Sequence, residues 1–201
     1  MPYFAITRNG IDLVCAGAPE ISELSARVIV MQEGRASLGV HGVRELDSGI
    51  EVLDWDSQTL RPGDRVEITY LTDATATAPR RSRQKRLPKS LAEVTAEMER
   101  IEQELQGFEQ RHAAELERRP QPRGAKAPRP RVLRVSVNGA APVDVALNEE
   151  EALQAALNLT SKGCVLAVES FTVLDGGETK DTHWVRGELS PGQRVQIAYV
   201  T

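Results

Sequence analysis

Few side chains in this sequence are of the types that carry out catalysis or bind metals. The candidates are His41, His112, His183, Cys15 and Cys164. None of them has a second ligand at a metal-binding spacing. The sequence also lacks the G-x-x-x-x-G-K-S/T phosphate loop, the G-x-G-x-x-G dinucleotide motif and the H-E-x-x-H zinc motif. We therefore expect a protein that is not an enzyme and that holds no metal or cofactor.

The cysteines and the N-terminal sequence bear on the cellular compartment. Cys15 and Cys164 do not occupy equivalent positions of the repeat described next, so a disulfide is not expected, and two single thiols suit a reducing cytoplasm. We expect both as small side chains that are buried or half-buried. The N-terminus lacks a secretory signal, and no apolar run approaches the ~20 residues that cross a bilayer. The sequence therefore predicts a cytoplasmic protein without membrane contact.

The chain contains an internal repeat with a constant offset of 129 residues. The matching positions are Asn9-Gly10 and Asn138-Gly139, Trp55 and Trp184, Leu60 and Leu189, Pro62-Gly63 and Pro191-Gly192, and Tyr70 and Tyr199. The closing segments LRPGDRVEITYLT and LSPGQRVQIAYVT are near-copies of each other. A repeat of this length indicates two copies of one structural module.

The repeat divides the chain into five predicted segments. These are repeat one (1–73), a basic linker (74–89), a long amphipathic helix (90–118), a Pro/Arg-rich linker (119–131) and repeat two (132–201). The two modules are acidic and the middle is basic, because residues 1–78, 79–134 and 135–201 carry net charges of −6, +7 and −5. This partition fits ordinary solvated surface, acidic faces that bind a basic partner, or basic ends that fold back onto the modules.

Each module is predicted to contain a β-hairpin, one helix and further strands. In repeat one, Leu24, Val28 and Met31 have helical spacing, and Gly34 is the expected stop. In repeat two the helical face is Leu153, Ala156 and Leu157, after a capping-box-like start at Asn148 and Glu151 and before Gly163. This order of elements is typical of a β-grasp module. The predicted fold class is therefore α+β, with two β-grasp-like modules joined by a long helix.

The middle helix begins with a capping box at Ser90 and Glu93 and carries a coiled-coil-like seam. The seam consists of Leu91, Val94, Met98, Ile101, Leu105, Phe108, His112 and Leu116. So narrow an apolar stripe needs a partner surface. Three alternatives are open: packing on the chain's own modules, a coiled coil that joins two chains into a homodimer through 90–118, and binding to another protein.

The two tryptophans are the most informative single residues, because both repeats keep them. Trp55 and Trp184 fit aromatic anchors on a binding face, or side chains that each cover their own sheet. His183 has a different residue, Asp54, at its position in repeat one, so we expect a surface histidine.

The residues Gly63-Asp64-Arg65-Val66 resemble the turn before the last strand of ubiquitin-like sulfur carriers. Those proteins act through a C-terminal Gly-Gly, whereas this sequence ends Tyr199-Val200-Thr201. Repeat one also resembles small, uncharacterised bacterial proteins of β-grasp-like topology. The matching residues are Asn9-Gly10, Leu24-Ser25-Ala26, Leu46-Asp47-Ser48, Trp55 and Leu60 to Ile68. This resemblance implies a duplicated module and brings no known activity with it.

These features predict a non-enzymatic protein-binding module, such as an immunity protein or a dimeric adaptor. Its acidic modules would bind a basic protein partner through charge complementarity. The alternative is a nucleic-acid-associated protein that uses the basic segments Arg80–Lys89 and Arg118–Arg134. The acidic modules and the absence of stacking aromatics in those segments argue against nucleic acid.

Overall fold

The computed structural model describes residues 2–86, 94–96, 98, 100, 103, 131–147, 152–173 and 179–200. Of these residues, 71% lie in β-strands and 4% are helical. The chain divides into two compact units, Met1–Lys85 with Arg129–Thr201, and Arg86–Pro128, and the β-sheets belong to the first unit. No helix within the described residues is long and apolar enough to span a membrane.

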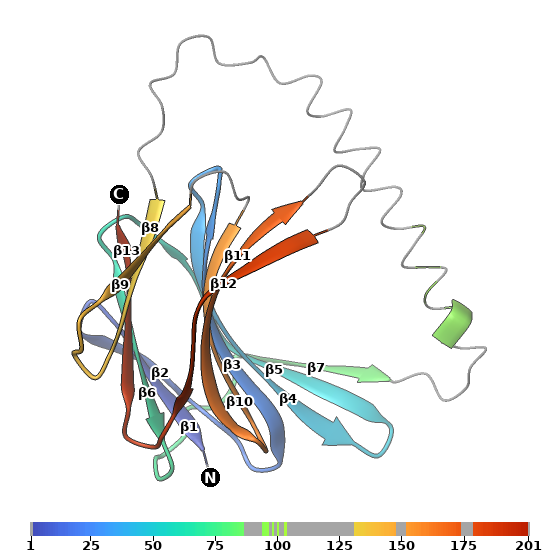
Figure 1. Cartoon of the computed structure of the whole chain (residues 1–201). Coiled ribbons are helices and arrows are strands. Elements are labelled where there is room, and N and C mark those ends of the chain that lie inside the picture. Colours follow the sequence, from blue (N-terminus) through green and yellow to red (C-terminus); the bar gives the residue numbers. More distant parts are fainter. Residues whose placement is uncertain are drawn as a thin grey trace. The chain divides into compact units, whose positions relative to one another are not determined.

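Both repeats fold into six strands in the same order (Figure 1). Repeat one forms β1 (Tyr3–Arg8), β2 (Ile11–Ala16), β3 (Ile21–Met31), β4 (Ala36–Leu46), β5 (Gly49–Leu60) and β6 (Arg65–Leu71). Repeat two forms β8 (Arg131–Val137), β9 (Val143–Leu147), β10 (Ala152–Thr160), β11 (Gly163–Val173), β12 (Thr179–Leu189) and β13 (Arg194–Val200). A further strand, β7 (Arg81–Arg86), follows repeat one.

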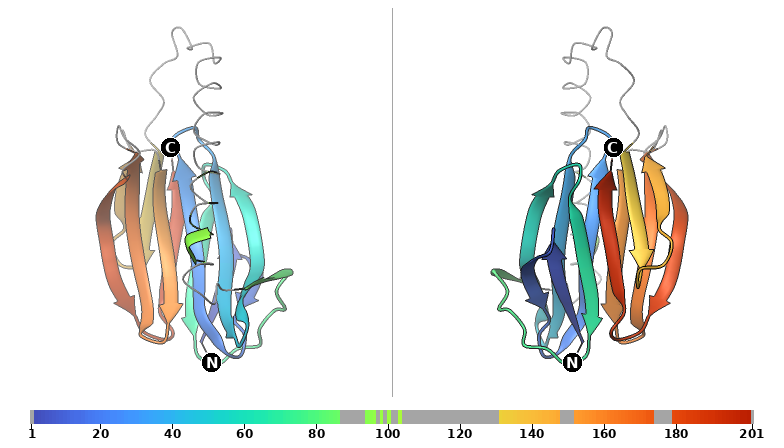
Figure 2. Two further views of the ribbon diagram at one scale, coloured as in Figure 1. Left: turned by 90° about the vertical axis from the view of Figure 1, so that its right-hand side faces the viewer. Right: turned by 90° about the vertical axis from the view of Figure 1, so that its left-hand side faces the viewer.

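The strands form two antiparallel sheets, and each sheet runs through both repeats (Figure 2). The six-stranded sheet has the order β2-β1-β6-β13-β8-β9, and the seven-stranded sheet has the order β12-β11-β10-β3-β4-β5-β7. The repeats join where β6 pairs with β13 and where β3 pairs with β10. Each repeat therefore supplies half of each sheet.

The two sheets enclose one hydrophobic core to which both repeats contribute. Its largest fully buried side chains are Trp55, Phe4, Ile6, Leu24, Leu38, Ile68, Leu133, Leu153, Leu157, Leu166, Ile197 and Val28. Cys164 is buried in this core and Cys15 is half-buried, as predicted. Burial raises the pKa of the Cys164 thiol to about 12, so this cysteine stays protonated in the folded protein.

The helix predicted in repeat one is wrong, because its residues form β3. Leu24, Ala26, Val28 and Val30 are each at most 1% exposed, which is the period-two burial of a strand. The helical spacing from Leu24 to Met31 arises because Ile29 and Met31 on the other face of β3 are also apolar, so the apolar residues match a helix as well as a strand. Gly34, the expected helix stop, lies instead in the turn to β4, with φ +89°.

The helix predicted in repeat two is wrong for the same reason. Leu153, Ala155, Leu157 and Leu159 of β10 are at most 3% exposed and alternate along the strand. The predicted cap at 148–151 lies outside the described residues. Each described module is all-β, so the predicted α+β fold with β-grasp-like modules is corrected to two antiparallel sheets.

The prediction of a long coiled-coil helix over 90–118 is also wrong. No helix in the described part of the chain has seven or more residues. Two of the predicted seam residues are described there, Val94 at 37% and Met98 at 66% exposed. The others, Leu91, Ile101, Leu105, Phe108, His112 and Leu116, lie outside the described residues.

The Pro-Gly turns hold the two repeats together at the centre of the six-stranded sheet. The Gly63 N–H donates to the Tyr199 carbonyl at 2.8 Å, and the Gly192 N–H donates to the Tyr70 carbonyl at 2.7 Å. Both glycines have positive φ, +95° and +86°, which only glycine adopts without strain. The turn of each repeat therefore caps the last strand of the other.

Candidate functional site at the ends of the sandwich

Each repeat ends in one outer strand of each sheet, β2 and β5 in repeat one and β9 and β12 in repeat two. We call the region between these two strands an end of the sandwich. We name the end between β2 and β5 the covered end, because the segment 72–86 lies across it. Thr77 makes the bridge: its N–H donates to the Cys15 carbonyl of β2 at 2.8 Å, and its carbonyl accepts from Trp55 Nε1 of β5 at 2.7 Å. The hydroxyl of Thr77 also accepts from the Cys15 N–H at 3.2 Å. Trp55 is left only 1% exposed.

After Thr77 the segment adds β7 to the edge of the seven-stranded sheet, alongside β5. The first contact is the Arg80 N–H, which donates to the Asp54 carbonyl at 2.8 Å. The guanidinium of Arg80 then binds the carboxylate of Asp56 at 2.8 Å, and the Asp56 side chain is fully buried. Asp56 also accepts from the Ser57 N–H at 2.9 Å and from Gln58 Nε2 at 2.8 Å, so its buried charge is fully paired.

A second carboxylate, Asp54, holds the middle of β7. Asp54 accepts from His41 Nδ1 at 2.8 Å and from Arg83 Nη2 at 3.1 Å. Partial burial raises the pKa of the Asp54 carboxyl, but His41 and Arg83 outweigh it, and the pKa lies below its ordinary value. Further along, hydrogen bonds from Ser82 and Arg44 lower the pKa of Glu51. A row of β5 carboxylates thus binds this basic strand.

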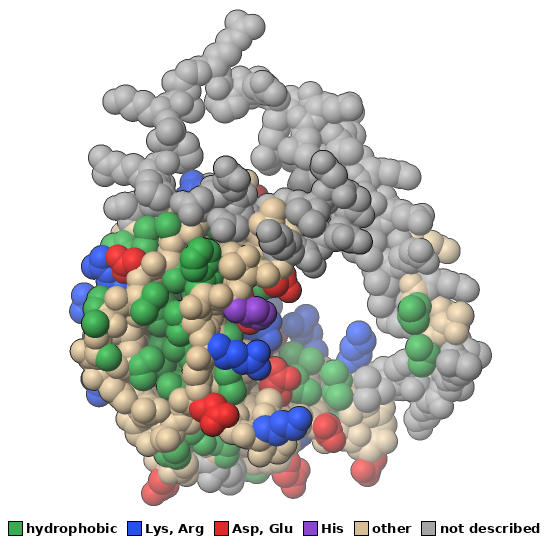
Figure 3. Space-filling model, in the orientation of Figure 1, with side chains coloured by type: hydrophobic (Ala, Val, Ile, Leu, Met, Phe, Trp, Pro, Cys, Tyr) green, Lys and Arg blue, Asp and Glu red, His purple; other side chains and the backbone are tan. Residues whose placement is uncertain are grey.

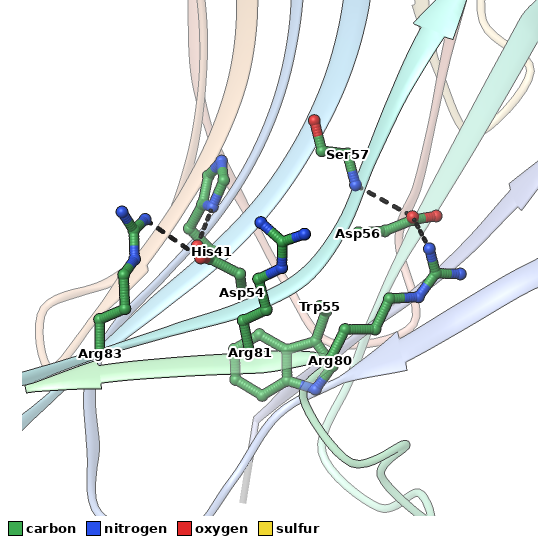
Figure 4. Close-up of a pocket in the computed structure, with 8 residues that line it drawn as sticks. All are labelled: His41, Asp54, Trp55, Asp56, Ser57, Arg80, Arg81 and Arg83. Carbon is green, nitrogen blue, oxygen red and sulfur yellow. Dashed lines mark hydrogen bonds and ion pairs between the residues drawn. The ribbon is translucent and has the colours of Figure 1, made fainter.

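A pocket of about 350 Å³ is lined by His41, Asp54, Trp55, Asp56, Ser57, Arg80, Arg81 and Arg83 (Figure 4). Two of its arginines, Arg80 and Arg83, are neutralised by the aspartates, and the Arg81 side chain stands between them. In the described part of the chain no three His, Cys, Asp or Glu side chains are placed to hold a metal ion. The arrangement attaches β7 to the sheet, and we assign no reaction to it.

The second end of the sandwich, between β9 and β12, is the open end. No described strand lies beyond β12 or β9 in either sheet. Trp184 of β12 is 46% exposed, whereas its equivalent Trp55 is 1% exposed. Val143 of β9 is also 46% exposed, whereas its equivalent Val14 is 8% exposed. Figure 3, viewed from the side of repeat two, shows hydrophobic side chains gathered on this face.

The residue beneath each tryptophan differs between the repeats. The Trp55 ring lies directly over Gly42, where a β-carbon would be 2.8 Å from Cζ3 of the ring. In repeat two Ser170 is at this position, because it pairs with Thr182 as Gly42 pairs with Leu53, and its hydroxyl accepts from Trp184 Nε1 at 3.0 Å. The β-carbon of Ser170 stands where glycine leaves room for Cζ3 of Trp55, so the Trp184 ring cannot pack as closely on its strand. Both the missing cover and Ser170 contribute to the exposure of Trp184.

The histidine-carboxylate pair is reversed between the two ends. At the covered end His41 lies on β4 and Asp54 on β5, and at the open end Glu169 lies on β11 and His183 on β12. His183 Nδ1 is 3.0 Å from Glu169 Oε1, and the His183 side chain is 57% exposed, as expected for a surface histidine. The register of both strand pairs shifts at equivalent points, Val40/His41 and Val168/Glu169. The backbone of the two edges is therefore alike while the charges differ.

Of the predicted site residues, Trp55 and Trp184 lie in the sandwich, and the two have different roles. Trp55 covers its own sheet as a core residue, and Trp184 is available at the surface. The sequence analysis missed Val143, although its alignment with the buried Val14 was present in the repeat. It also missed Thr77, because nothing in the composition of 74–89 indicates that this segment crosses an end of the sandwich.

The chain matches no protein-family model, no curated protein and no solved structure. Within the chain, the two repeats offer a comparison of equivalent sites. Residues 72–86 cover the end of repeat one, and no described strand covers the equivalent end of repeat two.

Proposed function

We propose that this protein is a non-enzymatic protein-binding module and that its open end is the binding surface. The observation that carries the proposal is the contrast between Trp184 and Trp55, which are 46% and 1% exposed at equivalent positions. At the covered end the equivalent surface is filled by an extended segment of the chain itself, residues 72–86, and this supports a polypeptide as the partner of the open end. A partner at the open end would bury Trp184 and Val143 in the same way.

Two physical features make the open end suitable for this role. The half-exposed Trp184 on β12 is a typical binding anchor, because tryptophan buries a large area at a low entropic cost, and Val143 on β9 adds a second exposed apolar side chain. An edge strand such as β12 also presents unpaired N–H and C=O groups to an incoming chain. The combination gives affinity through the apolar side chains and alignment through the backbone.

The narrower roles expected from the sequence remain proposals. An immunity protein or an adaptor would use the open end to hold its partner in the cytoplasm. For the nucleic-acid alternative, the described part of Arg80–Lys89 offers less free charge than its composition suggests, because Arg80 and Arg83 are paired with Asp56 and Asp54. The ion pairs support protein binding over phosphate binding for this segment.

The test compares proteins that co-purify with the wild type and with two variants. Trp184→Lys places a charge at the centre of the open end, and Ile11→Lys makes the same change at another exposed apolar side chain, which is 69% exposed on β2. We expect W184K to lose at least about ten-fold of a specific partner and I11K to retain it. Equal recovery of the same partner by W184K, with unchanged circular dichroism, would contradict the proposal.

A further inference from the structure

We infer that the open end takes up an extended strand that pairs with β12, carrying an apolar side chain where the segment 72–86 has Arg80 and an acidic side chain where it has Arg83. The inference rests on the proposed function, because it names the kind of segment that binds the open end. The covered end provides the template for the geometry, and the residues of β12 determine the chemistry.

The geometry follows from the equivalence of β5 and β12. Both strands contain the same irregularity beside the tryptophan, since the register shifts at Val40/His41 against β5 and at Val168/Glu169 against β12. At the covered end the backbone bond from Arg80 to Asp54 begins the added strand at this point. Position 54 corresponds to His183, so a bound strand would begin its pairing at the His183 carbonyl. This is recognition by strand addition.

The first difference in chemistry is at position 56. Asp56 is the buried carboxylate that binds Arg80 at the covered end, and repeat two has Val185 in its place. An arginine above Val185 would lose the counter-charge that Arg80 finds in Asp56. An apolar side chain of the bound strand would instead extend the contact surface of half-buried Val185.

The second difference is at position 54, where the charges change sign. Across the covered end the side chains alternate as His41 on β4, Asp54 on β5 and Arg83 on β7. Across the open end the first two members are Glu169 on β11 and His183 on β12. An acidic side chain on the added strand completes the reversed alternation when His183 is an imidazolium: Nδ1, 3.0 Å from Glu169 Oε1, faces that carboxylate, and the Nε2–H donates to the added one. An arginine there would face an imidazole instead of a carboxylate.

The same reasoning excludes the β7 segment of a second copy as the occupant. That segment would bring Arg80 to Val185 and Arg83 to His183, and neither guanidinium would find the carboxylate it binds in its own chain. The open end therefore discriminates between a foreign acidic-apolar strand and the chain's own basic strand. Specificity of this kind comes from unpaired charges in the wrong complex as well as contacts in the right one.

The experiment titrates two synthetic peptides into the full-length protein and follows tryptophan emission. One peptide has the sequence of residues 72–86, TDATATAPRRSRQKR, and the other carries R80V and R83E in that sequence. We expect the exchanged peptide to shift the emission of Trp184 to shorter wavelength and to bind at least about five-fold more tightly than the native peptide. The W184F variant, which retains Trp55, should show no such shift.

A reciprocal variant makes the test independent of overall peptide affinity. E169H together with H183D recreates the His41–Asp54 pair at the open end, and both positions are on the surface of the sheet. We expect this variant to lose the preference for the exchanged peptide and to favour the peptide that keeps Arg83. The inference is overturned if the native peptide binds the wild type as well as the exchanged one, if neither peptide shifts Trp184, or if the double variant leaves the preference unchanged. Any of these results leaves the co-purification test with W184K to judge the proposed function separately.

Discussion

Gln196 Nε2 donates a hydrogen bond to Glu67 Oε2 at 2.8 Å, and these two residues occupy the same position of the two repeats, 129 residues apart. In the other sheet Arg27 pairs with Ala156, which is again its own equivalent. The repeats are therefore related by an approximate two-fold axis through the centres of both sheets. At each point where the axis crosses a sheet, a charged residue of repeat one meets a neutral residue of repeat two, so no charge faces its like.

This symmetry explains why the two ends can be compared residue by residue. The axis carries β5 onto β12 and β2 onto β9, and hence the covered end onto the open end. The segment 72–86 has no counterpart among the described residues of repeat two, and it breaks the symmetry. The proposed function depends on this missing cover, and the side chains that differ between the two ends determine what the open end can bind.

Gly42 should be essential for the packing of Trp55. In Gly42→Ala the new β-carbon would lie 2.8 Å from the Trp55 ring and 3.2 Å from the Glu23 carbonyl oxygen, so backbone or ring must move. We expect a loss of about 1 to 3 kcal/mol in the free energy of unfolding, measured by urea denaturation. The control is Gly187→Ala in β12, where a β-carbon meets no atom within 4 Å. A G42A protein as stable as G187A would show that the ring does not lie on Gly42.

Arg80 should contribute to stability and its neighbour Arg81 should not. Arg80→Ala leaves the fully buried Asp56 side chain without its guanidinium partner, although Ser57 and Gln58 still donate to it. We expect a loss of about 1 to 3 kcal/mol in unfolding free energy. Arg81→Ala removes an exposed side chain and should change stability by less than about 0.5 kcal/mol. Chemical denaturation of both variants at one pH decides the matter, and equal losses would contradict the role of Asp56.

Asp64 should make the protein sensitive to acid. Partial burial raises the pKa of this carboxyl, but hydrogen bonds from the Arg61 N–H, Arg8 and Asn9 outweigh it and hold the pKa below its ordinary value. A carboxyl whose pKa is lowered on folding stabilises the protein above its unfolded pKa, and that stability is lost as the pH falls through the folded pKa. We therefore expect unfolding free energy to fall as the pH is lowered below about 4.

The variant Asp64→Gln tests this assignment, because repeat two has Gln193 at the same position, and its side chain accepts from the Ser190 N–H at 2.7 Å. D64Q should keep the equivalent bond from the Arg61 N–H and lose the ion pair with Arg8. We expect it to be less stable at pH 7 by about 1 to 3 kcal/mol and to lose less stability than the wild type between pH 5 and pH 2. Parallel curves of stability against pH for the two proteins would show that Asp64 is not responsible.

The duplication can be recognised from the sequence, because equivalent residues recur 129 positions apart. Its turns can also be recognised, because each depends on residues that are adjacent in the chain. The Asn-Gly and Pro-Gly pairs are turn-forming sequences, and Asn9, Gly10 and Gly63 have the positive φ values that such turns require. Apolar residues alternate over 133–137 and 143–147, as is typical of strands, and these residues lie in β8 and β9.

The interpretation of 24–31 and 153–157 as helices failed for a physical reason. These strands pair with each other across the repeats, Leu24 opposite Leu159 and Val30 opposite Leu153. Polar residues alternate with apolar ones over part of each strand, but Ile29 and Met31 in β3 and Ala156 in β10 are apolar residues outside this alternation, and the resulting short apolar runs fit a helix equally well. The roles of Thr77 and Val143 depend on which edges meet at an end of the sandwich, and one sequence does not contain that information.

The most direct test of the account is the accessibility of the two tryptophans to a neutral quencher. The chain has two tryptophans, so the W184F variant reports Trp55 alone, and the difference between wild type and W184F reports Trp184. With acrylamide as quencher, we predict that W184F emits at shorter wavelength and is weakly quenched, because the segment 72–86 and the core enclose Trp55. The strongly quenched emission of the wild type should disappear with Trp184. A W184F protein quenched as strongly as the wild type would contradict the claim that one end of the sandwich is covered and the other is open.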